Sequence, residues 1–209
     1  MRLIVVFLLL AGMARAEPGQ PGAFDHYVLA LSWSAGWCAV EGDARGADQC
    51  HPRHDHGFLL HGLWPQHAAG GWPEFCQSPH APPSRAETRA MADIMGSAGL
   101  AWHQWRKHGS CSGLTSQTYF AVSRRAYDAV VQPDVFRRLV APVRLAPDVV
   151  EEAFIDANPA LSSEAVIVSC PGGHVTELRI CLGRDLAARP CSAEMIACAR
   201  PTVVMDPPR

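Results

Sequence analysis

The sequence lacks any apolar stretch long enough to cross a lipid bilayer, although 48% of its 209 residues are hydrophobic. A transmembrane helix needs about 20 apolar residues, whereas the longest apolar run covers only residues 3–13. Arg2 precedes this run and Ala14-Arg15-Ala16 follows it, which is typical of a secretory signal peptide with its cleavage site. We therefore expect residues 1–16 to be a signal peptide and residues 17–209 to form a single domain. The mature protein is expected in the periplasm or outside the cell, and not in a membrane.

Cysteine pairs of the zinc-binding type are also absent, because no Cys-x-x-Cys spacing occurs in the chain. The eight cysteines are Cys38, Cys50, Cys76, Cys111, Cys170, Cys181, Cys191 and Cys198. An even number of cysteines in an exported chain predicts disulfides, here four of them. Their spacing alone leaves the pairing open.

Positive charge is scarce. Lys107 is the only lysine, the rest of the 18 basic residues are arginines, and the formal net charge is −2. Removal of residues 1–16 takes away two arginines and no acidic residue, which moves this charge to −4. Such a chain does not attract polyanions indiscriminately at neutral pH. Its 10 histidines would become cationic in moderate acid, so we expect activity on a polyanion to favour acidic conditions.

Internal repeats, linkers and low-complexity tracts are missing as well, so one α+β domain accounts best for the chain. Apolar, β-prone runs predict strands over residues 27–33, 58–64, 165–169 and 175–181, with Pro65 ending the second. Amphipathic patterns predict helices over residues 84–95, 100–108, 116–131 and 148–157. Ser84 and Glu87 have capping-box spacing at the first of these helices.

The segment His61-Gly62-Leu63-Trp64-Pro65 ends the second predicted strand. Because side chains alternate across a strand, Phe58, Leu60 and Trp64 are expected on one face and Leu59, His61 and Leu63 on the other. This pattern places an ionisable ring among leucines. Taken alone, such a histidine is more often a core residue bonded to a carbonyl group than a catalytic group.

The segment 102–111 concentrates polar groups on one side of a predicted helix. At about 100° per residue, His103, Gln104, Lys107 and His108 share one face. Trp102 and Trp105 fall on the other side, where both indoles are expected to anchor the helix in the core. The alternative is a solvated polar face. The single lysine argues against this alternative. A chain that otherwise uses arginine would be expected to use it for a mere surface cation as well, and an ammonium group differs chemically from a guanidinium fork.

Two histidines, a third histidine and a lysine can together cleave RNA. One imidazole can act as general base and another as general acid, while the remaining cations hold the phosphate and stabilise charge in the transition state. RNA carries its own nucleophile, the 2′-hydroxyl, beside the scissile phosphate, so the reaction is intramolecular and yields a 2′,3′-cyclic phosphate. It requires neither a metal nor a cofactor, and it excludes DNA, which lacks that hydroxyl.

The two segments also carry a family resemblance. HGLWP at 61–65 and HQWRKHGSC at 103–111 closely resemble the active-site segments of the ribonuclease T2 family of acid ribonucleases, and FDHYVLALSWSAGWC at 24–38 resembles its first strand. This resemblance implies that His61 is the general acid, His108 the general base, His103 the phosphate-binding histidine and Lys107 the transition-state stabiliser. It further implies a central antiparallel sheet flanked by helices, and a secreted, monomeric endoribonuclease acting on single-stranded RNA.

The resemblance extends to the C-terminal cysteines and implies four disulfides: Cys38–Cys50, Cys76–Cys111, Cys170–Cys198 and Cys181–Cys191. The second would tie the end of the active-site helix to the loop after HGLWP. Gln104 departs from the family, which usually has a glutamate there. Glutamine carries no proton to transfer but can hydrogen-bond a phosphate oxygen, so we expect reduced or altered activity. Trp64 is expected either to stack on a base or to belong to the core.

Two other functions compete with this interpretation. His51, His54, His56, His61 and His67 cluster in the sequence and could bind zinc or copper. Their spacing matches no recognised ligand pattern, and His103 and His108 are five residues apart rather than the four of a helical zinc pair. The second alternative is a catalytically impaired relative that binds RNA or a partner, which only Gln104 supports.

Overall fold

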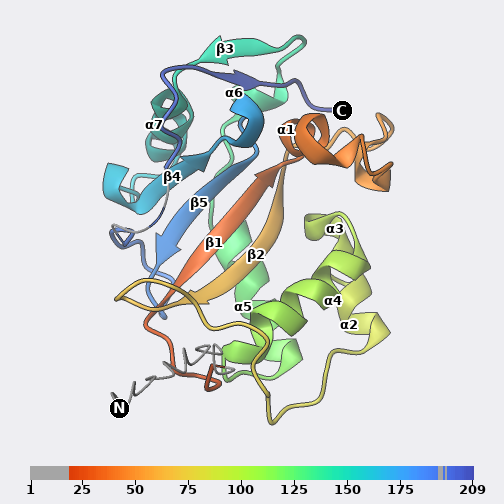
Figure 1. Ribbon diagram of the computed structural model, residues 1–209, viewed down its shortest axis with the longest axis vertical. Helices are drawn as coiled ribbons and strands as arrows, with labels where there is room; N and C mark the ends of the chain where they lie inside the picture. The colour runs from red at the N-terminus through yellow and green to blue at the C-terminus, as the bar shows by residue number, and fades with distance from the viewer. Residues whose placement is uncertain (1–18, 193–194, 196) are drawn as a thin grey trace, which may run out of the picture.

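The computed structural model describes residues 19–192, 195 and 197–209, so the predicted signal peptide lies outside the described residues. A four-stranded antiparallel sheet in the order β2-β1-β5-β4 forms the centre of the fold (Figure 1). Its strands are β1 (His26–Trp33), β2 (Phe58–Gln66), β4 (Val166–Ser169) and β5 (Glu177–Leu182). A second, two-stranded sheet joins β3 (Val143–Leu145) to β6 (Val203–Met205), near the C-terminus.

Helices flank the central sheet. They are α1 (Ser34–Trp37), α2 (Arg85–Arg89), α3 (Ala92–Met95), α4 (Ala98–Lys107), α5 (Ser116–Asp128), α6 (Asp134–Arg137) and α7 (Pro147–Ala157). Shorter turns are the π-helical η1 (Cys38–Gly42) and the 3-10 turns η2 (Asp48–Cys50), η3 (Gly109–Cys111), η4 (Ser163–Ala165) and η5 (Pro171–Gly173). Helix α5 passes behind β1 and β2, and α7 packs on β4 (Figure 1). Helices α3 and α4 lie beside β2, and α2 packs against α4. The predicted α+β fold with its antiparallel sheet is confirmed.

One face of the central sheet forms the hydrophobic core with α5 and α7. The fully buried core side chains include Leu29, Leu31, Trp33, Leu60, Leu63, Tyr119, Phe154, Val168, Leu178 and Ile180. Alternation then directs the intervening side chains of β1 and β5 to the opposite face. On that face lie Val28 and Ser32, each of which lines a cavity. The sheet therefore separates a packed apolar layer from a face that can hold a ligand.

Two predicted elements end differently in the structure. The helix expected over residues 84–95 begins with a capping box of Ser84 and Glu87, as predicted, but a turn at Ala90 and Met91 divides it into α2 and α3. Strand β2 continues through Pro65 to Gln66. Proline is tolerated there because β2 is an edge strand, bonded only to β1, so the missing N–H interrupts no second ladder.

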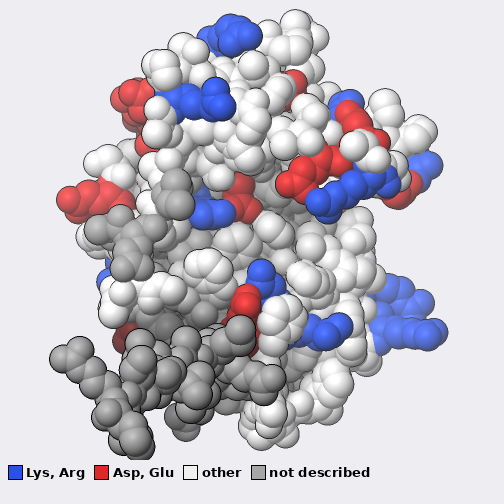
Figure 2. Space-filling model, viewed as in Figure 1, with Lys and Arg blue, Asp and Glu red and all other residues white. Residues whose placement is uncertain are grey.

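Four disulfides join Cys38 to Cys50, Cys76 to Cys111, Cys170 to Cys198 and Cys181 to Cys191, which are the pairs that the family resemblance implies. Across the described residues, no helix is both long and apolar enough to cross a membrane. Acidic and basic side chains are interspersed on the face shown in Figure 2, where the described residues form no broad surface of positive charge. On this face, positive charge is therefore local rather than spread over a surface.

Candidate active site

A β-bulge sets the direction of His61. Strand β1 pairs Ala30 with Gly62 and Leu31 with Leu60, which leaves His61 as the extra residue of β2. The extra residue reverses the alternation of side chains beyond it. Leu63 consequently enters the core, whereas Trp64 turns to the same side as His61. The strict alternation expected for this strand, with Trp64 beside Leu60 and Leu63 beside His61, is therefore wrong.

His61 contacts a buried carboxylate rather than leucines. Its Nδ1 lies 2.6 Å from Oε2 of Glu177, and Nε of Arg179 donates to Oε1 of the same carboxylate at 2.6 Å. Burial of Glu177 raises its pKa, but the hydrogen bond and charge of His61 and the charge of Arg179 outweigh this effect and lower the pKa below its ordinary value. Because an ionised carboxylate only accepts hydrogen bonds, Nδ1 of His61 carries the proton of this bond.

Glu177 and Arg179 were missed by the sequence analysis, although β5 contains a signal. Its residues alternate between polar and apolar, with Leu178 and Ile180 fully buried in the core. Glu177 and Arg179 therefore share the opposite face of the strand. Charged residues two apart on a strand at the centre of a sheet indicate a polar site on that face.

Helix α4 carries the second predicted segment. Ser97 caps its N-terminus by accepting a hydrogen bond from the Leu100 amide, and His108 follows its last residue. Ala101, Gln104 and Trp105 are buried, which centres the buried face near Ala101. Trp102 lies beyond the edge of this face by the 100° rule and is 38% exposed. The expectation that both indoles anchor the helix is thus correct for Trp105 and wrong for Trp102.

Trp64 connects the two segments. Its Nε1 donates to Oε1 of Gln104 at 2.8 Å, and its ring stacks on His108 with 5.1 Å between centroids and 27° between planes. His61 meets the same indole edge-on, at 5.1 Å and 81°. A Cβ atom on Gly62 would lie 2.3 Å from Oε1 of Gln104 and 2.4 Å from Nε1 of Trp64, so only glycine leaves room for this bond.

His108 is buried and neutral over most of the pH range. Burial lowers its pKa to about 3, with smaller contributions from the positive charges of Lys107, His61 and His103. Its Nδ1 is buried and makes no hydrogen bond within the described residues. The Nε2 atom is therefore the one that can accept a proton from a ligand. Such a histidine remains unprotonated in mild acid, as a general base must.

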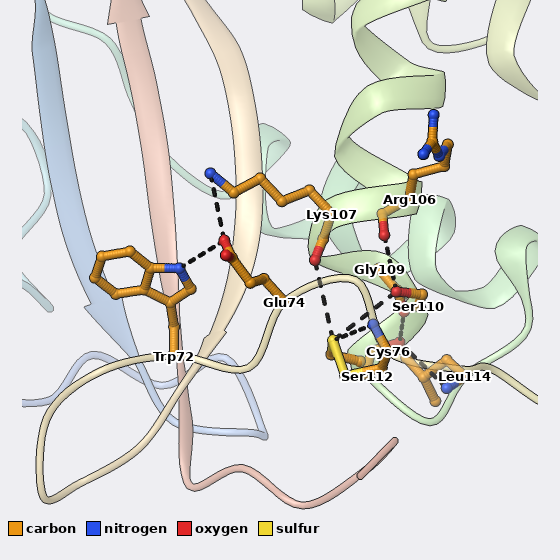
Figure 3. The surroundings of a disulfide bond; sticks show 10 residues. Trp72, Glu74, Cys76, Arg106, Lys107, Gly109, Ser110, Ser112 and Leu114 are labelled. Carbon is orange, nitrogen blue, oxygen red and sulfur yellow. Dashed lines mark hydrogen bonds and ion pairs between the residues drawn. A yellow bond between two sulfur atoms is a disulfide. The ribbon is translucent and has the colours of Figure 1, made fainter. Parts of the chain in front are cut away.

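Lys107 is held against the loop that follows β2 (Figure 3). Its Nζ lies 3.6 Å from Oε2 of Glu74, which also accepts a hydrogen bond from Nε1 of Trp72 at 3.3 Å. The Phe75 amide donates to the carbonyl of Lys107 at 2.8 Å. The disulfide Cys76–Cys111 ties the same loop to η3, directly after the helix. Glu74 was not expected from the sequence, where it is one acidic residue in a loop.

The six predicted site residues line one cavity of about 380 Å³. They are His61, Trp64, His103, Gln104, Lys107 and His108. Trp72 and Arg179 also line it. A second cavity of about 430 Å³ lies next to the first and shares His61 and Arg179 with it. The bulge of β2 and the end of α4 thus bring together residues that are 39 to 47 positions apart in the sequence.

The histidines of the competing metal hypothesis are not assembled. His54 stacks on His56 with 4.9 Å between ring centroids and contacts Asp48 in the loop before β2. His61 instead lines the cavities. Within residues 19–192, 195 and 197–209, no three His, Cys, Asp or Glu side chains gather closely enough to hold a metal ion.

Structural comparison places this fold beside known ribonucleases. The RNase-related protein from Calystegia sepium superposes with a TM-score of 0.66 at 19% identity, covering 88% of this chain and 97% of that one. RNase NT in complex with 5′-AMP gives a TM-score of 0.59 at 18% identity, covering 88% and 98%. At these identities the similarity concerns the fold.

Sequence comparison identifies the family. A ribonuclease of Aeromonas hydrophila is 41% identical over 124 residues, which are 57% of this chain and 54% of that protein. A relative from Haemophilus influenzae is 31% identical over 53% of this chain and 44% of its own length, so the chain spans about half the length of these two relatives. Ribonuclease I of Escherichia coli is 27% identical over 91% of this chain and 88% of that protein. The sequence model of the ribonuclease T2 family matches residues 24–143, more than half of the chain, which therefore belongs to the ribonuclease T2 family.

Proposed function

We propose that this protein is an endoribonuclease that cleaves single-stranded RNA by acid–base transphosphorylation. The observation that carries the proposal is the contrast between two histidines in one cavity. His61 is bonded to the ionised carboxylate of Glu177, which stabilises an imidazolium. His108 is buried beneath Trp64 and its pKa is about 3, which keeps it neutral. Two like groups in opposite environments are suited to opposite proton transfers.

The proposed reaction has two proton transfers. Nε2 of His108 takes the proton of the 2′-hydroxyl, and the 2′-oxygen then attacks phosphorus. The bond from phosphorus to the 5′-oxygen breaks, and Nε2 of His61 gives its proton to that oxygen. The products are a 2′,3′-cyclic phosphate and a free 5′-hydroxyl. Hydrolysis of the cyclic phosphate follows with the two histidines in exchanged roles.

The remaining residues of the cavity bind the phosphate in this proposal. His103 and Lys107 supply positive charge on the exposed side of α4, where negative charge develops in the transition state. Gln104 has its oxygen occupied by Trp64, so its amide NH₂ group is what remains to donate to a phosphate oxygen. The neighbouring structure of RNase NT holds 5′-AMP, which supports a nucleotide ligand for this fold.

We further propose that the mature protein is a secreted or periplasmic monomer that works without a metal or cofactor. The apolar segment at residues 3–13 and the four disulfides support export into an oxidising compartment. Because the nucleophile belongs to the substrate and the two histidines move the protons, the chemistry requires no metal ion. Fractionation and gel filtration of the purified protein test the location and the monomeric state.

The decisive experiment compares wild type, His61→Ala and His51→Ala on a mixed-sequence RNA, at pH 5 and pH 7.5, with EDTA or Mg²⁺ present. His51 is an exposed histidine of the loop before β2 and serves as the matched control. We expect wild type and His51→Ala to cleave equally with EDTA, faster at pH 5, and to leave 2′,3′-cyclic ends, whereas His61→Ala is inactive. Absence of cleavage by wild type at either pH would instead favour the catalytically impaired, RNA-binding or partner-binding relative.

A further inference from the structure

Arg179 stands where the two cavities meet. Strand β1 pairs Ala30 with Gly62 on one side and with Arg179 on the other, so Arg179 lies across the sheet from the bulge at His61. His61 and Arg179 line both cavities, of about 380 and 430 Å³. A polynucleotide that extends from one cavity into the other must therefore pass these two side chains.

The guanidinium group of Arg179 is only partly used within the protein. Its Nε donates to Oε1 of Glu177 at 2.6 Å, and its Cζ lies 5.6 Å from the ring centroid of Trp64. Its two terminal Nη groups make no hydrogen bond with any described residue, and 29% of the side chain is exposed. Up to four N–H donors remain for a ligand.

We propose that Arg179 has two roles in this site, an inference that rests on the proposed function. Its Nε holds Glu177, which orients His61, and its Nη groups bind a phosphate of RNA where the cavities meet. Arginine suits both roles, because a planar fork can contact one carboxylate with Nε and a phosphate with Nη. The ammonium of a lysine is a single point charge and cannot hold both partners in this geometry.

The charges around the site favour the phosphate role. Lys107 is already paired with Glu74, and the net charge of the chain is −2. With no broad cationic surface on the face shown in Figure 2, each cation in the cavities contributes a large part of the attraction for RNA. A guanidinium group keeps its positive charge throughout the pH range in which proteins are assayed.

The test measures binding of a single-stranded DNA oligonucleotide, which offers phosphates but lacks the 2′-hydroxyl and is not cleaved. Dissociation constants are measured at pH 5 over a range of salt concentrations for wild type, Arg179→Gln, Arg179→Lys and Arg124→Gln. Arg124 pairs with Asp93 on the surface, outside both cavities, and is the matched control. Thermal unfolding shows that each variant is folded at the assay temperature.

We expect Arg179→Gln to bind about tenfold more weakly at low salt, because one charge-assisted contact is lost. The slope of log K against log salt should become shallower by about 0.7, the value for one phosphate contact on a single strand. Arg179→Lys should keep the slope but lower kcat on RNA, because its ammonium cannot also hold Glu177. Arg124→Gln should match wild type in all three measurements.

Two outcomes separate this inference from the proposed function. RNA cleavage by wild type, together with unchanged binding and salt slope in Arg179→Gln, would overturn the role of Arg179 and leave the ribonuclease proposal standing. Binding that depends on Arg179 in a wild-type protein that does not cleave RNA would support the phosphate site and overturn the ribonuclease proposal.

Discussion

Trp64 donates its indole N–H to the side-chain oxygen of Gln104 at 2.8 Å, and this bond joins β2 to α4 in the wall of the cavity. Gly62 leaves the space for it, and the stacking of Trp64 on His108 depends on the same indole position. Gln104 is 2% exposed. The residue that departs from the usual family pattern therefore has a structural partner as well as a place in the cavity wall.

Replacing Gln104 by leucine should leave the indole N–H of Trp64 without an acceptor. An unsatisfied buried donor costs about 1–3 kcal/mol. Because Trp64 is only partly buried and lines the cavity, the free energy of unfolding in urea should fall by an amount near the lower end of that range. Activity should also fall, because Trp64 no longer holds His108. Gln104→Glu keeps an acceptor for Trp64 and is the matched control, with stability closer to wild type at neutral pH. Equal stability and activity of Gln104→Leu and wild type would contradict a role for this bond.

Glu177→Gln should lower kcat while leaving KM nearly unchanged. The neutral amide no longer stabilises a charged His61, and it can donate its NH₂ to Nδ1 and so favour a different proton arrangement on the ring. We expect a loss of at least tenfold, since general acid catalysis contributes about 10²–10⁴. The pH–rate profile should also change shape, because the variant lacks a carboxylate that titrates next to His61.

A merely structural role for Glu177 would produce a different result. In that case stability would fall while the shape of the pH–rate profile stayed the same. Glu151→Gln is a suitable control, because Glu151 is also a partly buried carboxyl and accepts a hydrogen bond from the Val168 amide, but it lines neither cavity. Its pH–rate profile should match that of wild type.

His108 should make the protein less stable in acid. Its pKa falls from 6.5 to about 3 on folding, so between these values the unfolded chain binds a proton that the folded chain does not. Stability therefore decreases as the pH falls through this window. His108→Asn removes the effect, and its stability relative to wild type should be higher at pH 4 than at pH 7 in urea unfolding. His51→Asn controls for the loss of a histidine, and an identical pH dependence in His108→Asn and wild type would refute the assignment.

The helices and the antiparallel sheet could be anticipated, because capping residues, amphipathic periodicity and the family resemblance all concern short segments or known motifs. The direction of the Trp64 side chain could not be anticipated. In Phe58-Leu59-Leu60-His61-Gly62-Leu63-Trp64 both faces of the strand carry apolar residues, so the sequence gives no sign of the bulge at His61. One extra residue then moves Leu63 into the core and Trp64 into the cavity.

The partners of the histidines were less predictable than the histidines themselves. Glu177 is 116 positions from His61, and only the folded sheet brings them together. Glu74 lies in a loop without regular structure. The path of this loop depends on the Cys76–Cys111 disulfide and on the hydrogen bond that the Phe75 amide donates to the Lys107 carbonyl. Strand β6 has three residues and was not predicted, since so short a segment has too little periodicity to be recognised.

Glu74→Gln should increase the affinity of the site for anions. Glu74 and Lys107 are partly exposed and 3.6 Å apart, so their ion pair contributes only about 0.2–1 kcal/mol to stability. A carboxylate beside Lys107 nevertheless repels an incoming phosphate. Removing its charge should lower the inhibition constant of inorganic phosphate about two- to fivefold, with little change in thermal unfolding. Glu152→Gln, an exposed carboxylate on α7 far from the cavity in sequence and fold, should leave inhibition unchanged. Weaker phosphate inhibition in Glu74→Gln would show instead that Glu74 is needed to hold Lys107 in position for the ligand.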